Sequence, residues 1–419
     1  MPADPRAPRP DRALRAFALP VLALVLGSGL IAATVFSVAG VELGDDAPHL
    51  LRLVAHPFVL FGDYRAAGFW DTWGSFPPLL PLLFGLLVRP WTWLVPDFWA
   101  IRLGALSWSL VCLAAMGWLS GRRRHGAPET RRALLAFAFL PTTLATISVL
   151  PQEETYVSLF VLALVEAART RRDRWLLPLL VLAMLAGKYF LLILVFPLAI
   201  HSGAPAQRIT RWLPVLVGLL GAYVASHWLL HGLTPILSHT LDPSASVSVW
   251  ALLWTLGLEV PPAVIKALSI VGSVGVVSAL CVRMKSDGAG LDSMVVVSLL
   301  ATLLCISITF PGYVMWVLPL ALVTGLSLPV RTQWQQVALF ALWGAAELTA
   351  NFSRGVALAL HTPRSAGKSA VAEAAAAVLG ADFPYGAVQI LGIVGVLACG
   401  GLLIRLHMRP GPGTAPTTR

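Results

Sequence analysis

The chain has 419 residues, of which 57% are hydrophobic and 12% are charged, with a formal net charge of +10. A water-soluble domain of this length cannot cover its surface with so few charged residues, so the composition excludes that class. The positive charge does not indicate nucleic-acid binding, because the arginines stand in short clusters between apolar blocks, where they orient membrane helices.

The apolar blocks are roughly 17 to 25 residues long, the length that crosses a hydrocarbon core. Backbone polar groups find no partners in lipid, so these blocks must be helices, and the alternating pattern of a membrane β-barrel is absent. The sequence therefore predicts an all-α fold. We expect a polytopic transmembrane bundle of about 11–13 membrane helices, with juxtamembrane helices at its outer face.

Residues 1–15 are rich in Pro and Arg, which predicts a cytoplasmic tail. The apolar stretch to about Gly40 is too long for a signal peptide and is predicted to be the first span. Outer loops are expected at 41–99, 231–260 and 351–385, and a disordered tail at 409–419. Further spans are predicted near 100–120, 133–150, 155–168, 212–230, 262–282, 290–309, 313–330, 334–350 and 386–405.

Two apolar segments cannot cross the membrane as single helices if all basic clusters lie in the cytoplasm. Segment 77–95 then lies in the outer interface as a partly inserted helix, unless it crosses and breaks the rule locally. Segment 175–201 must go out and return as two short helices that turn near Gly187-Lys188-Tyr189. The clusters are Arg122–Arg124 with Arg131 and Arg132, Arg169–Arg174, Arg208 with Arg211, Arg283 with Lys285, Arg331, and Arg405 with Arg409.

With this orientation most carboxylates fall at the outer face. A cluster of carboxylates with one buried cation is what glycosyl transfer needs: a base for the acceptor hydroxyl and a positive charge for the departing phosphate. No Gly-rich nucleotide loop is present, so a donor used outside must be attached to lipid. The acids are Glu42, Asp45, Asp46, Asp63, Asp71, Asp97, Glu153, Glu154, Asp242 and Glu259, with Glu347 near the outer end of its span.

Several motifs follow one another in a recognisable order. They are Gly44-Asp45-Asp46-Ala47-Pro48-His49-Leu50, Gly62-Asp63-Tyr64, Phe76-Pro77-Pro78-Leu79, Pro151-Gln152-Glu153-Glu154, Gly187-Lys188-Tyr189-Phe190, and Phe310-Pro311-Gly312-Tyr313 with Trp316 and Pro319. This order resembles the GT-C glycosyltransferases, polytopic enzymes that use polyprenyl-phosphate sugars and include mannosyltransferases and aminoarabinose transferases. The resemblance implies that 16–330 form the catalytic core. Residues 331–408 carry no family signature and are predicted from their apolar spans to add C-terminal transmembrane helices. The acidic pair here is Asp-Asp, where the family more commonly has Asp-Glu.

By this resemblance Asp45 is the general base, and Asp46 orients it or holds the acceptor or a metal. The alternative for the pair is a helix N-cap, since Asp-x-Pro begins helices. No cofactor is required, although the two carboxylates are also able to hold a divalent cation.

Further residues are predicted to bind substrate. Lys188 is assigned to the donor phosphate, or else pairs with Glu153 or Glu154. These glutamates either bind the acceptor or form a solvated turn. The remaining candidates each keep a structural alternative: Arg102 meets a phosphate or an outer-loop acid, His49 touches the acceptor or lies on an interfacial helix face, and Tyr313 and Trp316 stack on sugar or belong to the interfacial aromatic belt.

The sequence thus predicts an inverting glycosyltransferase that moves a hexose or pentose, such as mannose, to a glycolipid, polysaccharide or protein acceptor. We place it in the plasma membrane of a bacterium, with its N-terminus in the cytoplasm and its active site outside. The alternative is a multi-pass transporter or lipid flippase, which should show two related halves and charges near the bilayer midplane. The sequence shows no such repeat.

Overall fold

A computed structural model describes residues 10–39, 51, 80–149, 151, 154–186, 189–201, parts of 212–222, 247–306, 312–361, 377–380 and 382–408. Within these ranges every element is helical and no strand occurs. Four helices there are long and apolar enough to cross a membrane, over Phe17–Ser37, Asp97–Arg122, Ala263–Ser286 and Tyr385–His407. These helices indicate a membrane protein, and the larger number of spans stays a prediction.

The helices have the following bounds in chain order. They are α1 (Pro10–Ala39), α4 (Leu80–Thr92), α5 (Asp97–Arg122), α6 (Ala127–Phe139), α7 (Pro141–Ser148), α8 (Glu154–Arg169), η2 (Asp173–Trp175), α9 (Leu176–Ala186), η3 (Tyr189–Leu194), α10 (Val195–His201), α13 (Val249–Thr255), α14 (Pro262–Ser286), α15 (Leu291–Cys305), η5 (Tyr313–Trp316), α16 (Leu318–Gly325), α17 (Val330–His361) and α19 (Tyr385–His407).

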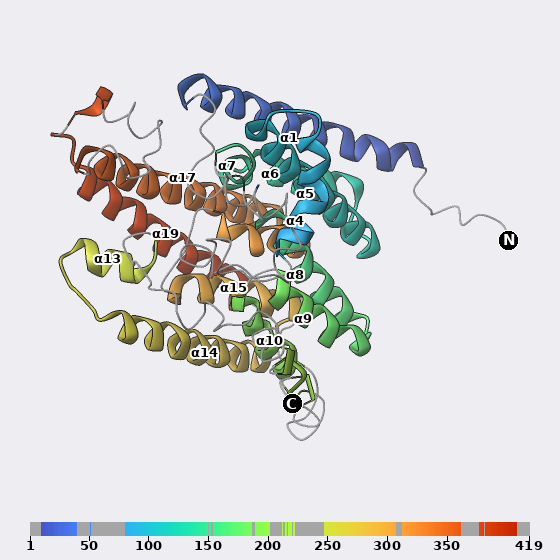
Figure 1. Cartoon of the computed structure of the whole chain (residues 1–419). Helices are drawn as coiled ribbons and strands as arrows, with labels where there is room; N and C mark the ends of the chain where they lie inside the picture. The colour runs from blue at the N-terminus through green and yellow to red at the C-terminus, as the bar shows by residue number, and fades with distance from the viewer. Residues whose placement is uncertain are drawn as a thin grey trace.

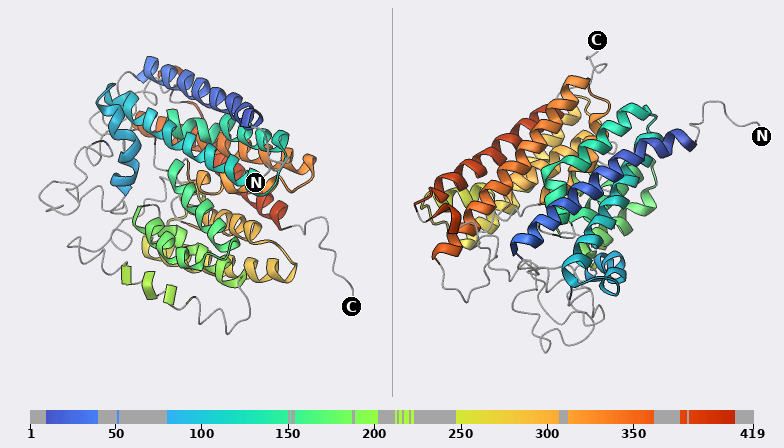
Figure 2. Two further views of the ribbon diagram at one scale, coloured as in Figure 1. Left: turned by 90° about the vertical axis from the view of Figure 1, so that its right-hand side faces the viewer. Right: turned by 90° about the horizontal axis from the view of Figure 1, so that it is seen from above.

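Most of the long helices run along one common direction and form a bundle (Figure 2). In Figure 1, α1 lies on one side of this bundle and α14 on the opposite side, with α15 and α8 between them. Every residue of α16 is buried, so this short helix belongs to the core of the bundle. Helix α4 runs across the common direction, as expected for a helix that lies in the membrane interface (Figure 1).

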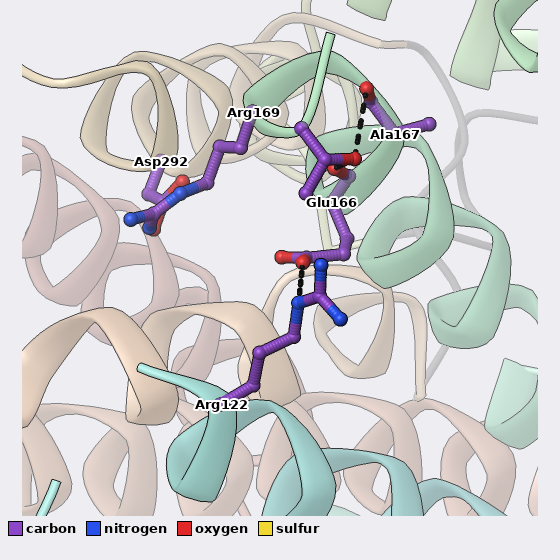
Figure 3. A network of polar contacts seen from close by, with 6 residues as sticks. Arg122, Glu166, Ala167, Arg169 and Asp292 are labelled. Carbon is purple, nitrogen blue, oxygen red and sulfur yellow. Dashed lines mark hydrogen bonds and ion pairs between the residues drawn. The ribbon is translucent and has the colours of Figure 1, made fainter. Parts of the chain in front are cut away.

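Ion pairs join the ends of three helices at one end of the bundle. Asp292, in the first turn of α15, accepts from Arg123 Nη1 at 2.6 Å and from Arg169 Nη1 at 2.8 Å. Arg122 Nε lies 2.5 Å from Glu166 Oε1 on α8. Figure 3 shows Arg169 and Arg122 pointing at these two carboxylates. We call this the basic end of the bundle, because arginine clusters that are predicted to lie in the cytoplasm meet there.

Segment 175–201 forms the predicted pair of short helices. Helix α9 ends at Ala186 and the turn η3 begins at Tyr189, so the break falls where the sequence places it. Lys285 Nζ at the end of α14 donates to the Ile200 carbonyl oxygen at 2.5 Å, which ties the end of α10 to the basic end. The pair therefore begins and finishes at the same end of the bundle.

Two predicted spans are interrupted. The span expected over 133–150 is not one continuous helix, because α6 ends at Phe139 and α7 begins at Pro141. A proline disfavours helical backbone in the residue before it, and Leu140 is accordingly extended at φ −64° and ψ 135°. Segment 313–330 likewise divides into the 3₁₀ turn η5 and the short α16, with Pro319 in the first turn of that helix.

Helices α17 and α19 lie side by side in the bundle (Figure 1). A Cβ atom added to Gly392 would lie 2.7 Å from both the Ala346 carbonyl oxygen and the Ala350 Cβ. Only glycine fits at this distance, so Gly392 sets the close approach of the two helices. Helix α17 continues to His361, eleven residues past the expected end of its span at 350.

Two helices end on an arginine in the left-handed conformation. Arg124 after α5 has φ 59°, and Arg171 after α8 has φ 53°. The His125 N–H binds the Ser120 carbonyl and the Arg172 N–H binds the Ala167 carbonyl, which is the Schellman pattern that usually has glycine at this position. A left-handed L-residue costs roughly 1–2 kcal/mol, so the chain keeps positive charge at the basic end despite strain.

Candidate functional site at the end opposite the basic clusters

The structure describes three of the predicted site residues, namely Arg102, Glu154 and Tyr313. They lie at the ends of α5, α8 and η5 that are opposite the basic end. Helix α1 also finishes here, because Phe36 packs against Phe98 at the start of α5 with ring centroids 5.1 Å apart. The other predicted residues, Asp45, Asp46, His49, Glu153 and Lys188, lie outside the described residues.

Glu154 and the η5 turn form a buried contact. Trp316 Nε1 donates to Glu154 Oε2, and Tyr313 stacks on the Trp316 ring with centroids 4.4 Å apart. Glu154 is 1% exposed, so its interpretation as a solvated turn is wrong. Tyr313 and Trp316 are also buried, at 7% and 1%, so the interfacial-belt alternative is wrong for them. The reason is that η5 packs onto α8 within the bundle.

A second carboxylate reaches this contact from α17. Glu347 is 1% exposed, receives a hydrogen bond from the Gly312 backbone N–H, and lies close enough to Glu154 for the two to interact electrostatically. Sequence reasoning placed Glu347 at the outer end of its span but gave it no role. The signal that points to it is an isolated glutamate in an apolar run, which is costly in lipid and commonly functional.

Gly312 makes the approach of the two carboxylates possible. Its φ of 104° is strained for any L-residue, and an added Cβ would meet Thr146 Oγ1 at 3.0 Å and Glu154 Cγ at 3.4 Å. Glycine is therefore required where the backbone passes between α7, α8 and α17. We call Glu154, Glu347, Gly312, Tyr313 and Trp316 the paired-glutamate site.

Two buried polar atoms around this site have no hydrogen-bond partner among the described residues. They are Thr142 Oγ1 and Thr155 Oγ1. Trp343 lies beside Glu347, and Thr142 packs against the same helix, where its Oγ1 would be 2.4 Å from a Cβ on Gly344. Buried donors and acceptors normally bind a partner.

Arg102 is committed to backbone carbonyl groups. Its Nε donates to the Ser148 carbonyl at 2.8 Å and its Nη1 to the Phe98 carbonyl at 2.9 Å, while the guanidinium lies 3.6 Å from the Phe98 ring centroid. Ser148 ends α7, whose last carbonyls lack helical partners. Arg102 is 3% exposed and contacts no acid among the described residues, so it holds the turn that leads to Glu154.

The site offers two carboxylates and a stacked pair of aromatic rings, all of them buried. Carboxylates accept hydrogen bonds from hydroxyl groups, and the ring pair Tyr313–Trp316 is held rigid by stacking and by the bond to Glu154. Among the described residues, no group of three His, Cys, Asp or Glu side chains is placed to hold a metal ion. The cation-binding alternative for Asp45 and Asp46 lies outside these residues and stays a prediction.

Replacing Glu154 with alanine is expected to lower the free energy of unfolding by about 1–3 kcal/mol, because Trp316 Nε1 would stay buried without its acceptor. Glu154→Gln keeps an acceptor oxygen and should cost clearly less. Thermal unfolding of the purified protein in detergent measures both variants. Glu129→Ala, which removes a half-exposed partner of Arg132, serves as the control. Equal losses for the alanine and glutamine variants would contradict the hydrogen bond.

The site thus combines two carboxylates, two stacked rings and a glycine that no other residue can replace, all at one end of a helical membrane protein. Its residues come from α8, η5 and α17, which are far apart in the sequence. No protein-family model, no curated protein and no solved structure matches the chain.

Proposed function

We propose that the protein is a membrane glycosyltransferase that moves one sugar from a polyprenyl-phosphate donor to a cell-envelope acceptor at the outer face, with inversion. One observation carries the proposal: the arginine clusters and the pair of buried glutamates lie at opposite ends of the bundle. Arg122, Arg123 and Arg169 meet at one end, whereas Glu154 and Glu347 meet at the other.

The arginine clusters support an outer location for the site. Basic clusters beside membrane helices stay in the cytoplasm, so the paired-glutamate site belongs to the outer end. Helix α1 finishes at this outer end with Ala39, six residues before Asp45 in the sequence. Lys188 stands between Ala186 and Tyr189, where the α9–η3 pair turns back. The proposal therefore assigns the acidic pair and the isolated lysine to this outer end.

The proposed reaction is a direct displacement. Asp45 takes the proton of the acceptor hydroxyl while the hydroxyl oxygen forms a bond to the anomeric carbon. The bond from that carbon to the phosphate oxygen breaks, and the lipid phosphate leaves with the electron pair, neutralised by Lys188. The acceptor is proposed to bind beside the packed group of Glu154, Tyr313 and Trp316. The resemblance to GT-C enzymes supports these roles for Asp45 and Lys188.

Analysis of lipid-linked sugars in cells with and without the gene tests this function. Loss of the enzyme should cause one polyprenyl-phosphate sugar to accumulate, because the step that consumes it is missing. The same cells should lack one sugar in an envelope glycan, and a plasmid carrying the wild-type gene should reverse both changes. Unaltered lipid-linked sugars together with an unaltered envelope would reject the proposal.

A proton-coupled transporter is the second candidate, favoured by one observation. Two interacting carboxylates buried inside a membrane bundle, Glu154 and Glu347, resemble a proton relay. Such a transporter would move solute or protons across vesicles that contain the purified protein, and it would consume no lipid-linked sugar. Flux that depends on Glu347 without sugar transfer would favour this candidate over the enzyme.

A further inference from the structure

A surface groove opens between α6, α7, α16 and α17, at the basic end of the bundle and away from the paired-glutamate site. Its volume is about 280 Å³, and Leu140, Leu322, Val337 and Ala341 line it. Phe139, at its edge, is 61% exposed, so the groove is open to the surroundings of the bundle. In a membrane protein those surroundings are lipid chains.

The groove also carries polar groups in a definite place. Arg132, Gln333 and Trp334 line it near the start of α17, at the basic end. Trp334 is 60% exposed, as tryptophan commonly is at the level of lipid headgroups. Gln336 lines the groove as well, is 1% exposed, and its Nε2 has no hydrogen-bond partner among the described residues. A buried amide donor normally finds an acceptor oxygen.

The mouth of the groove, which we define as the part lined by Arg132, Gln333 and Trp334, carries positive charge. Arg132 lies 3.4 Å from Glu129, and both side chains are about one third exposed, so this pair is weak. Arg331 stands exposed beside the residues that line the mouth and adds to the positive charge. A ligand that suits this mouth carries negative charge, and a ligand that suits the groove carries an apolar chain.

We propose that the groove binds one acyl chain of an anionic phospholipid from the membrane leaflet at the basic end. The phosphate lies at Arg132, the ester carbonyl oxygen accepts from Gln336 Nε2, and the chain runs along Leu140 and Ala341. This lipid is distinct from the polyprenyl donor, whose proposed site is at the opposite end of the bundle. Failure of this proposal would therefore leave the proposed sugar transfer untouched.

Native mass spectrometry of the purified full-length protein tests the binding directly. Phosphatidylglycerol and phosphatidylcholine with identical acyl chains are added at equal concentration, and the bound lipids are counted. The wild-type protein should retain one phosphatidylglycerol in preference to phosphatidylcholine. Arg132→Gln should lower that preference roughly fivefold, the effect of one arginine at a lipid headgroup. Ala341→Phe fills the groove and should abolish retention of either lipid at this site.

Two controls make the result decisive. Arg131→Gln removes an equal charge from the neighbouring residue, which does not line the groove, and should leave the preference within about twofold. Ala136→Phe fills the groove from α6 and replaces Ala341→Phe if that variant unfolds. Equal effects of Arg131→Gln and Arg132→Gln, or full lipid retention in both filled variants, would overturn the proposal. If Ala341→Phe or Ala136→Phe changed the oligomeric state of the protein and left lipid retention unchanged, the groove would be a protein–protein contact, and the lipid proposal would be overturned as well.

Discussion

Replacing Asp292 with alanine should lower the free energy of unfolding by about 3–5 kcal/mol, because it would leave Arg123 charged, buried and unpaired. The Arg123 side chain is 7% exposed, and its Nε and Nη2 already lack partners among the described residues. Burial lowers the pKa of the Arg123 guanidinium below its ordinary value, and the Asp292 charge opposes that effect. Arg169, whose side chain is 44% exposed, should contribute little of the loss.

Chemical or thermal unfolding in detergent, followed by near-ultraviolet circular dichroism, measures this loss. The matched control is Glu129→Ala, since Glu129 pairs with Arg132 where both side chains are partly exposed. That variant should lose at most about 1 kcal/mol, the usual worth of a surface ion pair. If the two alanine variants were equally stable, Asp292 would not hold the three helix ends together at the basic end (Figure 3).

Much of the fold could be predicted because charge and hydropathy act over whole segments. The pair α9 and η3–α10 illustrates this. Basic residues flank segment 175–201 on both sides, so the chain had to leave and return, and the break falls between Ala186 and Tyr189. The division at Leu140 and Pro141 was missed because the apolar run continues through it, although the proline itself was the available signal.

The candidate site was harder to predict, because packing between distant segments builds it. Glu154 and Tyr313 were both expected to bind substrate, and the structure brings them together through Trp316. No local pattern shows that α17 delivers Glu347 to the same place. The need for glycine at position 312 is not visible in the local sequence, because the side chains that an added Cβ would meet come from other helices.

Arg102 is a charged candidate residue whose side chain binds backbone carbonyl groups in the structure. A buried arginine at the outer end of a span was expected to meet a phosphate or an acid. Among the described residues its guanidinium binds two carbonyl oxygens, those of Ser148 and Phe98. The outer-loop acids lie outside these residues, so the predicted contact with an acid or a phosphate stays a prediction. The end of a helix leaves carbonyls that need donors, and a sequence does not reveal which side chain will supply them.

Replacing Asp45 with asparagine should lower the rate of sugar transfer by roughly 10²–10⁴-fold, the usual contribution of a general base. Asparagine has nearly the same size as aspartate but cannot accept a proton at neutral pH, so the change removes the chemistry and keeps the shape. Asp63→Asn is the matched control: it makes the same change in the same outer loop, at a residue with no proposed role. This control should transfer sugar within about threefold of the wild-type rate.

The most direct test of the account is the rate at which membranes containing each variant transfer labelled sugar from the accumulated polyprenyl-phosphate donor. Protein amounts are matched by immunoblot, and wild type, Asp45→Asn and Asp63→Asn are compared in the same lipid. Wild type and Asp63→Asn should transfer sugar rapidly, and Asp45→Asn should transfer almost none. Transfer by Asp45→Asn at the wild-type rate would contradict the proposed role of Asp45.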